Sequence, residues 1–248
     1  GQSFDESSLV LTCTHTHSGP GGCSHDALYN VVTPGFVSDN LQQIVNASVE
    51  AILAAQQSAA PTDLELASGR FANDVPVAWN RSLHAYNQNP DIVPQDKSNA
   101  HLALDRTMPI LSFRRDGELQ SLLSFFGVHA TCIGNTQEKY SGDNKGYASL
   151  ALEKELAKTG VKEPVAIFAQ ATAGDVSPHY HGVGDSARRR NIKGAAEYVY
   201  AQRNGQFQAE QAMAIVQQPS EEKITGGIES ILSYVDFSQQ KANPQYAN

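Results

Sequence analysis

Three short runs of apolar and β-branched residues each lead into polar, chemically reactive side chains. The runs cover residues 8–16, 121–129 and 165–169, and histidine, serine or aspartate stands at their ends or in the loops that follow. Runs of this length and composition are typical of buried strands. Ligand sites in α/β sheets lie where strands end, so we expect the three loops to share one crevice.

Helical patterns alternate with these runs. Apolar residues recur at helical spacing between Leu41 and Leu53, which predicts an amphipathic helix over about residues 39–58, with Ser38 as its N-cap. Two further helices are predicted, over residues 147–158, where Gly160 follows as the C-cap, and over most of residues 187–216.

Shorter strand patterns lie between the helices. They cover residues 62–75, 107–114 and 231–237, and the Asn-, Gln- and Pro-rich stretch 80–100 predicts a long ordered loop. Strands that alternate with helices indicate an α/β fold. We therefore expect a mixed sheet with helices packed around it and the active site at the strand ends.

The charge balance excludes one class of partner. The 248 residues contain 18 Lys and Arg against 26 Asp and Glu, a formal net charge of −8. Nucleic-acid binding needs a clustered positive field, and the basic run 188–190 is predicted to be a solvated helix face.

No run of 18 apolar residues exists, so no transmembrane segment is predicted. Because the chain starts at Gly1 rather than Met, we expect processing or truncation at its front.

The chain has three cysteines, Cys13, Cys23 and Cys132. They allow at most one internal disulfide, and their spacing fits no zinc-knuckle pattern. We expect them to behave as small buried hydrophobic residues.

His15 and His17 form an H-x-H pair at the end of the first run. Residues two apart on a strand point to the same side, so both imidazoles can approach one metal ion or one substrate. The glycine-rich turn at residues 18–22 lets backbone approach a ligand closely. The pair indicates a metal or catalytic site.

Each of the other candidates also has a plain structural explanation. His129 ends an apolar run, where a lone histidine is commonly a hydrogen-bonded core residue. Ser177 follows the third run but lacks the G-x-S-x-G elbow of serine hydrolases. Arg81 is suited to bind an oxyanion or to form a structural ion pair. His179 and His181 form either a second candidate metal pair or part of a solvated loop.

Several motifs, taken in their order along the chain, resemble the neutral, non-lysosomal ceramidases. They are THTHSGPGG at residues 14–22, NRS at 80–82 with Ala85-Tyr86 and Asn89-Pro90, GDNKGYA at 142–148, GDVSP at 174–178 and the tail segment 225–237. The resemblance covers nearly the whole chain, and several separated motifs in one order are far more specific than any single one.

The resemblance implies a zinc-dependent amidohydrolase that cleaves the N-acyl amide bond of ceramide into sphingosine and fatty acid. In that family, histidines matching His15 and His129 bind Zn²⁺, whereas the residues matching His17 and Arg81 contact the reacting amide. The serine matching Ser177 is a nucleophile or a pocket residue. Two further zinc ligands, a Glu and a Tyr, lie beyond this sequence, so residues 1–248 are expected to be an incomplete part of the catalytic domain.

The resemblance also implies partners and a location. We expect a ceramide or related N-acyl lipid taken from a membrane surface, completion of the zinc site by the remainder of the same enzyme, and a secreted, extracellular or periplasmic location. Two alternatives stay open: a serine-type lipid amidase or esterase of related fold, and a catalytically inactive relative that acts as a binding module.

Within the zinc enzyme, the nucleophile is either a water activated by zinc or Ser177. The water is favoured because it needs no separate activation of a serine. Asp143 or Asp175 is expected to orient a ligand histidine.

Overall fold

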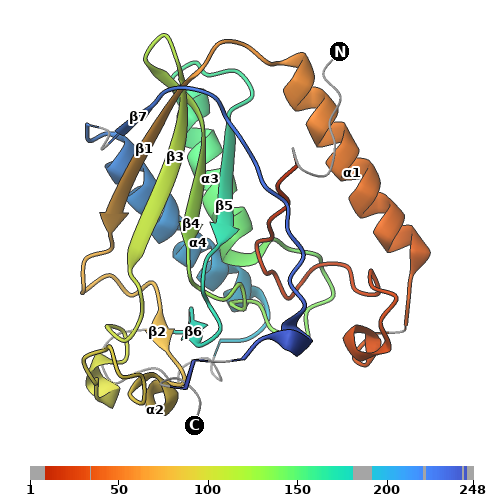
Figure 1. Cartoon of the computed structure of the whole chain (residues 1–248), viewed down its shortest axis with the longest axis vertical. Helices are drawn as coiled ribbons and strands as arrows, with labels where there is room; N and C mark the ends of the chain where they lie inside the picture. The colour runs from red at the N-terminus through yellow and green to blue at the C-terminus, as the bar shows by residue number, and fades with distance from the viewer. Residues whose placement is uncertain (1–8, 34, 181–191, 220–221, 242, 245–248) are drawn as a thin grey trace.

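A five-stranded mixed sheet forms the centre of the computed structural model, which describes residues 9–33, 35–180, 192–219, 222–241 and 243–244. Its strands lie in the order β5 (Val165–Gln170), β4 (Glu118–Phe126), β3 (Thr107–Arg115), β1 (Asp63–Arg70) and β7 (Glu222–Ile224). The β4–β5 pair is parallel and the other neighbours are antiparallel. The predicted α/β class with a mixed sheet is confirmed (Figure 1).

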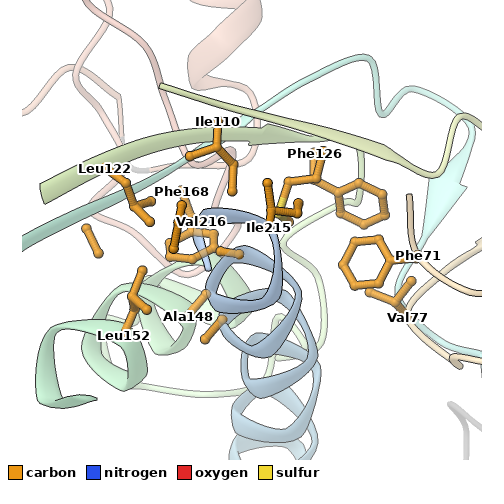
Figure 2. Packing of buried hydrophobic residues seen from close by; sticks show 14 of the residues in the cluster. Phe71, Val77, Ile110, Leu122, Phe126, Ala148, Leu152, Phe168, Ile215 and Val216 are labelled. Atoms are coloured by element: carbon orange, nitrogen blue, oxygen red, sulfur yellow. The ribbon is translucent and has the colours of Figure 1, made fainter. Parts of the chain in front are cut away.

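Two helices, α3 (Asp143–Lys158) and α4 (Ala195–Val216), pack against each other and cover one face of this sheet (Figure 1). Strand side chains alternate in burial because successive residues point to opposite faces. Ile110 and Leu122 are each 1% exposed on the helix side, whereas Leu111 and Leu123 on the other side are only partly buried. Figure 2 shows the resulting core, in which Leu122 and Phe168 from the sheet meet residues of both helices, among them Ala148, Leu152, Ile215 and Val216. Full burial stabilises the fold by roughly 1.5–3 kcal/mol for each large apolar side chain.

The two helices come closest where α4 carries Gly205. A Cβ atom on this residue would lie 2.6 Å from the carbonyl oxygen of Asn144 and 2.7 Å from the backbone nitrogen of Ala148. Only glycine fits such an approach of two backbones. It brings the first turn of α3, which holds part of the candidate site, directly against α4.

The helix α1 (Ser38–Gln57) lies beside the sheet and apart from α3 and α4 (Figure 1). The predicted helix over about 39–58 is therefore confirmed, but its predicted cap is wrong: the N-cap is Val37, and Ser38 is the first helical residue. No residue of α1 is buried, and its apolar residues Ile44, Val45, Val49 and Leu53 are 44–49% exposed. The amphipathic pattern thus has an apolar side that nothing in the described structure buries.

A second, two-stranded sheet stands next to the end of the main one. It pairs β2 (Trp79–Asn80) with β6 (Val176–Ser177) in antiparallel register. The loops on either side of β2 are held by Arg106, which is fully buried and donates to four backbone carbonyls, those of Phe71, Ala72, Val75 and His101. Burial lowers the pKa of this guanidinium to about 10, so it stays charged at neutral pH. The remaining short elements are η2 (Ala27–Asn30), α2 (Leu83–Tyr86), η3 (Lys97–Asn99) and η5 (Phe237–Gln239).

Two predicted strands are wrong. Residues 9–15 form no strand, and the predicted run ends in an isolated parallel bridge between Thr16 and Ala130. Residues 231–236 are irregular, with Ile231 and Tyr234 largely exposed, and the strand of the tail is instead β7. β-branched composition alone does not make a strand, because a strand also needs a partner edge with which to bond.

The cysteine expectation is also partly wrong. Cys13 is exposed, Cys23 is partly exposed and Cys132 is buried, and all three are free thiols.

The described part of helix 187–216 is α4, whereas His181 and the basic run 188–190 lie outside the described residues. Among the described residues, none of the helices has the length and apolar character needed to cross a membrane.

Candidate metal centre

Three histidines converge at one end of the main sheet. His15, His17 and His129 each offer a ring nitrogen, and these atoms lie within 4.8 Å of one another. The ring centroids of His15 and His129 are 4.7 Å apart, and those of His15 and His17 are 4.9 Å apart. His129 is buried, whereas His15 and His17 are exposed, so the cluster opens to solvent on one side. Three convergent imidazoles are a donor set that suits Zn²⁺.

His15 has a left-handed backbone conformation, with φ of 60°. A non-glycine residue there costs on the order of 1 kcal/mol or more, and such strain concentrates at functional sites. The segment is held against the sheet by backbone bonds from Gln170 to the Cys13 carbonyl (3.1 Å) and from His17 to the Ala130 carbonyl (3.3 Å). The two histidines are therefore presented by an extended segment that lies beside the end of β4, although it is not itself a strand.

Three consecutive residues at the start of α3 hold the loop that carries His129. Asp143, Asn144 and Lys145 are all 0% exposed. Their side chains bond the backbone on both sides of the histidine: Lys145 Nζ donates to the Phe126 carbonyl (2.7 Å), Asn144 Nδ2 to the His129 carbonyl (3.0 Å), and Asp143 accepts from the N–H groups of Cys132 (3.2 Å) and Ile133 (2.9 Å). Burial raises the pKa of the Asp143 carboxyl, and the hydrogen bonds it accepts oppose that shift. Burial lowers the pKa of Lys145 to about 7.

The imidazole of His129 is oriented by a backbone carbonyl. Its Nδ1 lies 3.2 Å from the Val176 carbonyl oxygen, and its Nε2 lies 3.3 Å from a terminal nitrogen of Arg81. A carbonyl oxygen only accepts, so Nδ1 carries the proton and Nε2 presents its lone pair. Burial, and then the charge of Arg81, lower the pKa of His129, which favours the neutral form that binds metals. The orienting group of His129 is thus not one of the two carboxylates expected from the sequence.

Arg81 reaches the cluster from the end of β2. Its backbone N–H donates to the Asp175 carbonyl (2.8 Å), and its guanidinium donates to the Gly174 carbonyl (2.9 Å). Asn80 supports this turn by donating to the Asp175 carboxylate (2.7 Å). The arginine is therefore fixed beside His129, with further N–H donors available for an anionic or carbonyl oxygen.

Ser177 lies in β6, one residue after the carbonyl that orients His129. It is 6% exposed, and its Oγ is 3.3 Å from Nδ1 of His179, which is itself buried. The structure thus brings His15, His17, His129 and Arg81 into one cluster. Ser177 directly follows Val176, which bonds His129, and its own hydroxyl contacts His179.

Residues 1–248 match the family model described as neutral/alkaline non-lysosomal ceramidase, N-terminal. The chain belongs to the neutral/alkaline non-lysosomal ceramidase family. It is 36% identical to a neutral ceramidase of Pseudomonas aeruginosa over 99% of its own length and 34% of that protein. It is 39% identical to neutral ceramidase B of Dictyostelium discoideum over 72% of its length and 25% of that protein.

A solved structure gives the same relationship. The crystal structure of the neutral ceramidase from Pseudomonas aeruginosa matches with a TM-score of 0.73 and 35% identity, over 88% of this chain and 32% of that one. A second solved structure, of a ceramidase complexed with C2, matches with a TM-score of 0.76 and 34% identity, over 91% of this chain and 33% of that one. The chain thus spans about a third of the length of the ceramidases it matches.

Sequence reasoning missed several residues of this ceramidase-family site. Gln170 ends β5 and bonds the segments of both His15 and His129, and Asn144 bonds the His129 carbonyl. The one available signal for Gln170 is its position, as the first polar residue after an apolar run. Side chains that bond backbone groups have no characteristic spacing, so nothing in the sequence assigned them partners.

Proposed function

We propose that the chain carries part of the zinc site of an enzyme that hydrolyses the N-acyl amide bond of ceramide, releasing sphingosine and a fatty acid. The observation that carries the proposal is the meeting of His15, His17 and His129 beside Arg81. The names of the relatives, all neutral ceramidases, support the substrate.

The donor set fits zinc in its chemistry. Imidazole nitrogens are common zinc ligands, and the Val176 carbonyl keeps the proton of His129 on Nδ1. Its Nε2, which lies 3.3 Å from Arg81 in this structure, is therefore the atom that would bind zinc. We assign His15 and His129 as zinc ligands. When bound, zinc would polarise the amide carbonyl and acidify a water molecule.

His17 and Arg81 have a separate role in this proposal. Both would donate hydrogen bonds to the amide oxygen as negative charge develops on it, and a donor of this kind lowers the activation free energy by roughly 3–4 kcal/mol. His17 also has the position of a third ligand, because its nitrogen belongs to the same 4.8 Å cluster. The variant His17→Ala separates the two roles: a ligand variant loses metal, whereas an oxyanion donor variant keeps its metal and loses kcat.

The contact between Ser177 and His179 supports a second candidate, a serine-type amidase or esterase of the same fold. There, His179 would accept the proton of Ser177, and the serine would form an acyl-enzyme. In the zinc enzyme, Ser177 instead lines the pocket. A kinetic burst of one acyl group per site, mapped to Ser177, would favour the serine mechanism.

We further propose that residues 1–248 are part of a larger catalytic domain, whose remaining zinc ligands are a Glu and a Tyr outside this sequence. The support is the chain's share of its relatives, about a third, and the exposed apolar side of α1. The substrate would be taken from a membrane surface, and a secreted, extracellular or periplasmic location stays a prediction.

The test uses the full-length protein that contains these residues. We expect one zinc ion per chain, hydrolysis of an N-acylsphingosine, loss of activity on chelation and recovery on adding zinc. Arg81→Met should keep its zinc and lose roughly 10²–10³-fold in kcat. Full activity after complete removal of metal would refute the zinc proposal and favour the serine candidate, whereas a metal-loaded protein that hydrolyses no N-acyl lipid would favour the inactive binding module.

A further inference from the structure

A single carboxamide connects the two segments that carry His15 and His129. The side chain of Gln170 accepts from the Val128 N–H (2.9 Å) and donates to the Val128 carbonyl (2.7 Å). The same nitrogen donates to the Thr14 carbonyl (3.3 Å), at a separation of 156 residues. Val128 and Thr14 are the residues directly before the two histidines. The three bonds use the amide oxygen and both N–H donors of Gln170.

The end of the sheet explains why a side chain is needed here. Gln170 and Phe126 are the last pair of the parallel β4–β5 ladder. Beyond them the two strands come so close that a Cβ on Gly127 would lie 2.3 Å from the Thr172 carbonyl oxygen. The chain from Gly127 to His129 therefore leaves the ladder. The side chain of Gln170 replaces the missing ladder bonds, because it offers the backbone of Val128 both a donor and an acceptor, as a neighbouring strand would.

The segment that carries His15 has few backbone bonds to the sheet, so its bonds to Gln170 make up a large share of what holds it there. It has one isolated bridge in place of a ladder, and the backbone N–H of Gln170 adds a bond to the Cys13 carbonyl. Gln170 thus touches Cys13 and Thr14 on one side and Val128 on the other. We therefore expect a change in this one side chain to alter the position of one histidine relative to the other.

We propose that Gln170 is a positioning residue, which sets the spacing of His15 and His129 for a shared metal ion. The inference rests on the proposed zinc site, because a metal is what requires that spacing. Metal ligands must be held within about 0.5 Å, and loss of the groups that orient them costs roughly 10–100-fold in metal affinity or activity. Gln170 itself does not touch the metal or the substrate in this proposal.

The test measures zinc affinity and unfolding rather than activity alone. Two variants of the full-length protein are compared with wild type: Gln170→Leu, which removes all three bonds, and Gln170→Glu, which keeps the length and the acceptor but loses both donors. We expect both to bind zinc roughly 10–100-fold more weakly in competition with a chelator. The rise in melting temperature on adding zinc should shrink in both variants, in addition to any fall in the melting temperature of the chelated protein, which itself loses hydrogen bonds. Should Gln170→Leu fail to fold, Gln170→Glu carries the test.

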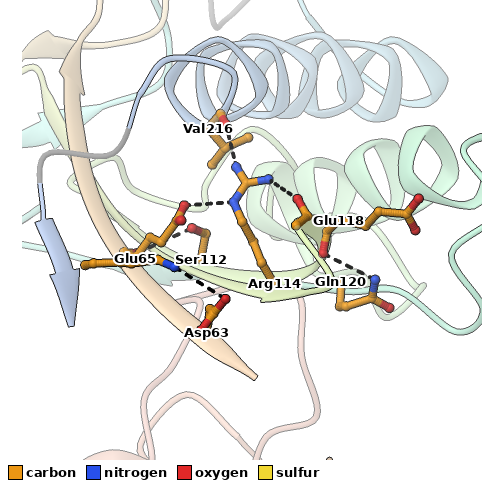
Figure 3. Close-up of polar contacts among 9 residues, drawn as sticks. Asp63, Glu65, Ser112, Arg114, Glu118, Gln120 and Val216 are labelled. Atoms are coloured by element: carbon orange, nitrogen blue, oxygen red, sulfur yellow. Dashed lines mark hydrogen bonds and ion pairs between the residues drawn. The ribbon is translucent and has the colours of Figure 1, made fainter. Parts of the chain in front are cut away.

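Arg114 provides a matched control at the opposite end of β4. It too bridges distant segments, by donating to the Val216 carbonyl (2.7 Å) and the Glu65 carboxylate (2.8 Å), as Figure 3 shows. It also donates to the Gly117 carbonyl (3.2 Å). Its partner in the sheet is Leu119, about 23 Å along the strand from Phe126. Arg114→Met should lower the melting temperature of the chelated and the zinc-loaded protein by the same amount and leave zinc affinity within about twofold.

The outcomes separate this inference from the proposed function. Weaker zinc binding in both Gln170 variants, together with unchanged zinc affinity in Arg114→Met, supports a positioning role for Gln170. A wild-type protein that binds zinc and hydrolyses its substrate, together with Gln170 variants of unchanged zinc affinity, overturns the inference and leaves the function standing. A wild-type protein that binds no zinc overturns both.

Discussion

The contact between α3 and α4 predicts opposite effects for the same substitution at two glycines. Gly146 lies in α3 and Gly205 in α4, and replacing a helical glycine with alanine stabilises a helix by about 1 kcal/mol. A Cβ on Gly146 has no atom within 4 Å, so Gly146→Ala should realise that gain. A Cβ on Gly205 would lie 2.6–2.8 Å from two backbone atoms and from Cβ of Tyr147, so the helices must separate.

The difference between the variants isolates this steric cost. The gain in helix propensity is the same for both, so it cancels, and overpacking costs about 1–3 kcal/mol. Urea unfolding of the full-length protein, followed by circular dichroism, should therefore place Gly205→Ala about 1–3 kcal/mol below Gly146→Ala, with similar m-values. A Gly205→Ala protein at least as stable as Gly146→Ala would refute the close packing of α3 on α4.

Two further predictions concern the scaffold of the site. The folded-state pKa of Lys145, about 7, lies below its unfolded value, so above pH 7 the unfolded chain binds a proton that the folded chain lacks. The free energy of unfolding should then rise with pH by about 1.4 kcal/mol per unit between pH 7.5 and 9.5, and Lys145→Met should remove this slope in unfolding titrations; equal slopes would contradict it. A neutral amine still has two N–H donors for its bonds to Phe126 and Gln208. At Gly127, an added Cβ 2.3 Å from the Thr172 carbonyl should cost about 1–3 kcal/mol, read as a lower urea midpoint of Gly127→Ala, whereas a wild-type midpoint would contradict the close approach.

The main strands could be predicted because the strand residues that pack into the core are apolar, which leaves a recognisable pattern of residue types in the sequence. β5 was predicted from its apolar composition, although Val165 and Ile167 on one of its faces are 49% and 46% exposed. β4 begins three residues before its predicted start, at Glu118, and ends at Phe126 rather than at His129. The same composition failed for residues 9–15 and 231–236, because strand formation there depends on a partner edge that composition does not reveal.

The site could be predicted only as separate candidates. The spacing of His15 and His17 indicated a shared ligand, and the strand-end argument placed their loop and that of His129 in one crevice. Only the family resemblance paired His15 with His129, 114 positions away, on one metal ion. The structure brings the three nitrogens together. Gln170 and the run from Asp143 to Lys145 act through backbone groups, and backbone groups are the same for every sequence. Their roles could therefore be assigned only from the three-dimensional structure.

The bonds between Gln170 and the segment before His15 join positions 156 and 157 residues apart, which orders events during synthesis. A growing chain that has not yet produced β5 lacks the bonds from Gln170 to Cys13 and Thr14 and can hold this segment only through its contacts with Ala130 and Ser141. Closure of so long a loop is also slow and costly in entropy. The histidine cluster should thus be among the last features of this chain to form. Metal capture would then follow the assembly of the sheet rather than nucleate it, and a nascent chain that ends before Gln170 would hold its His15–His17 pair less firmly than the finished protein does.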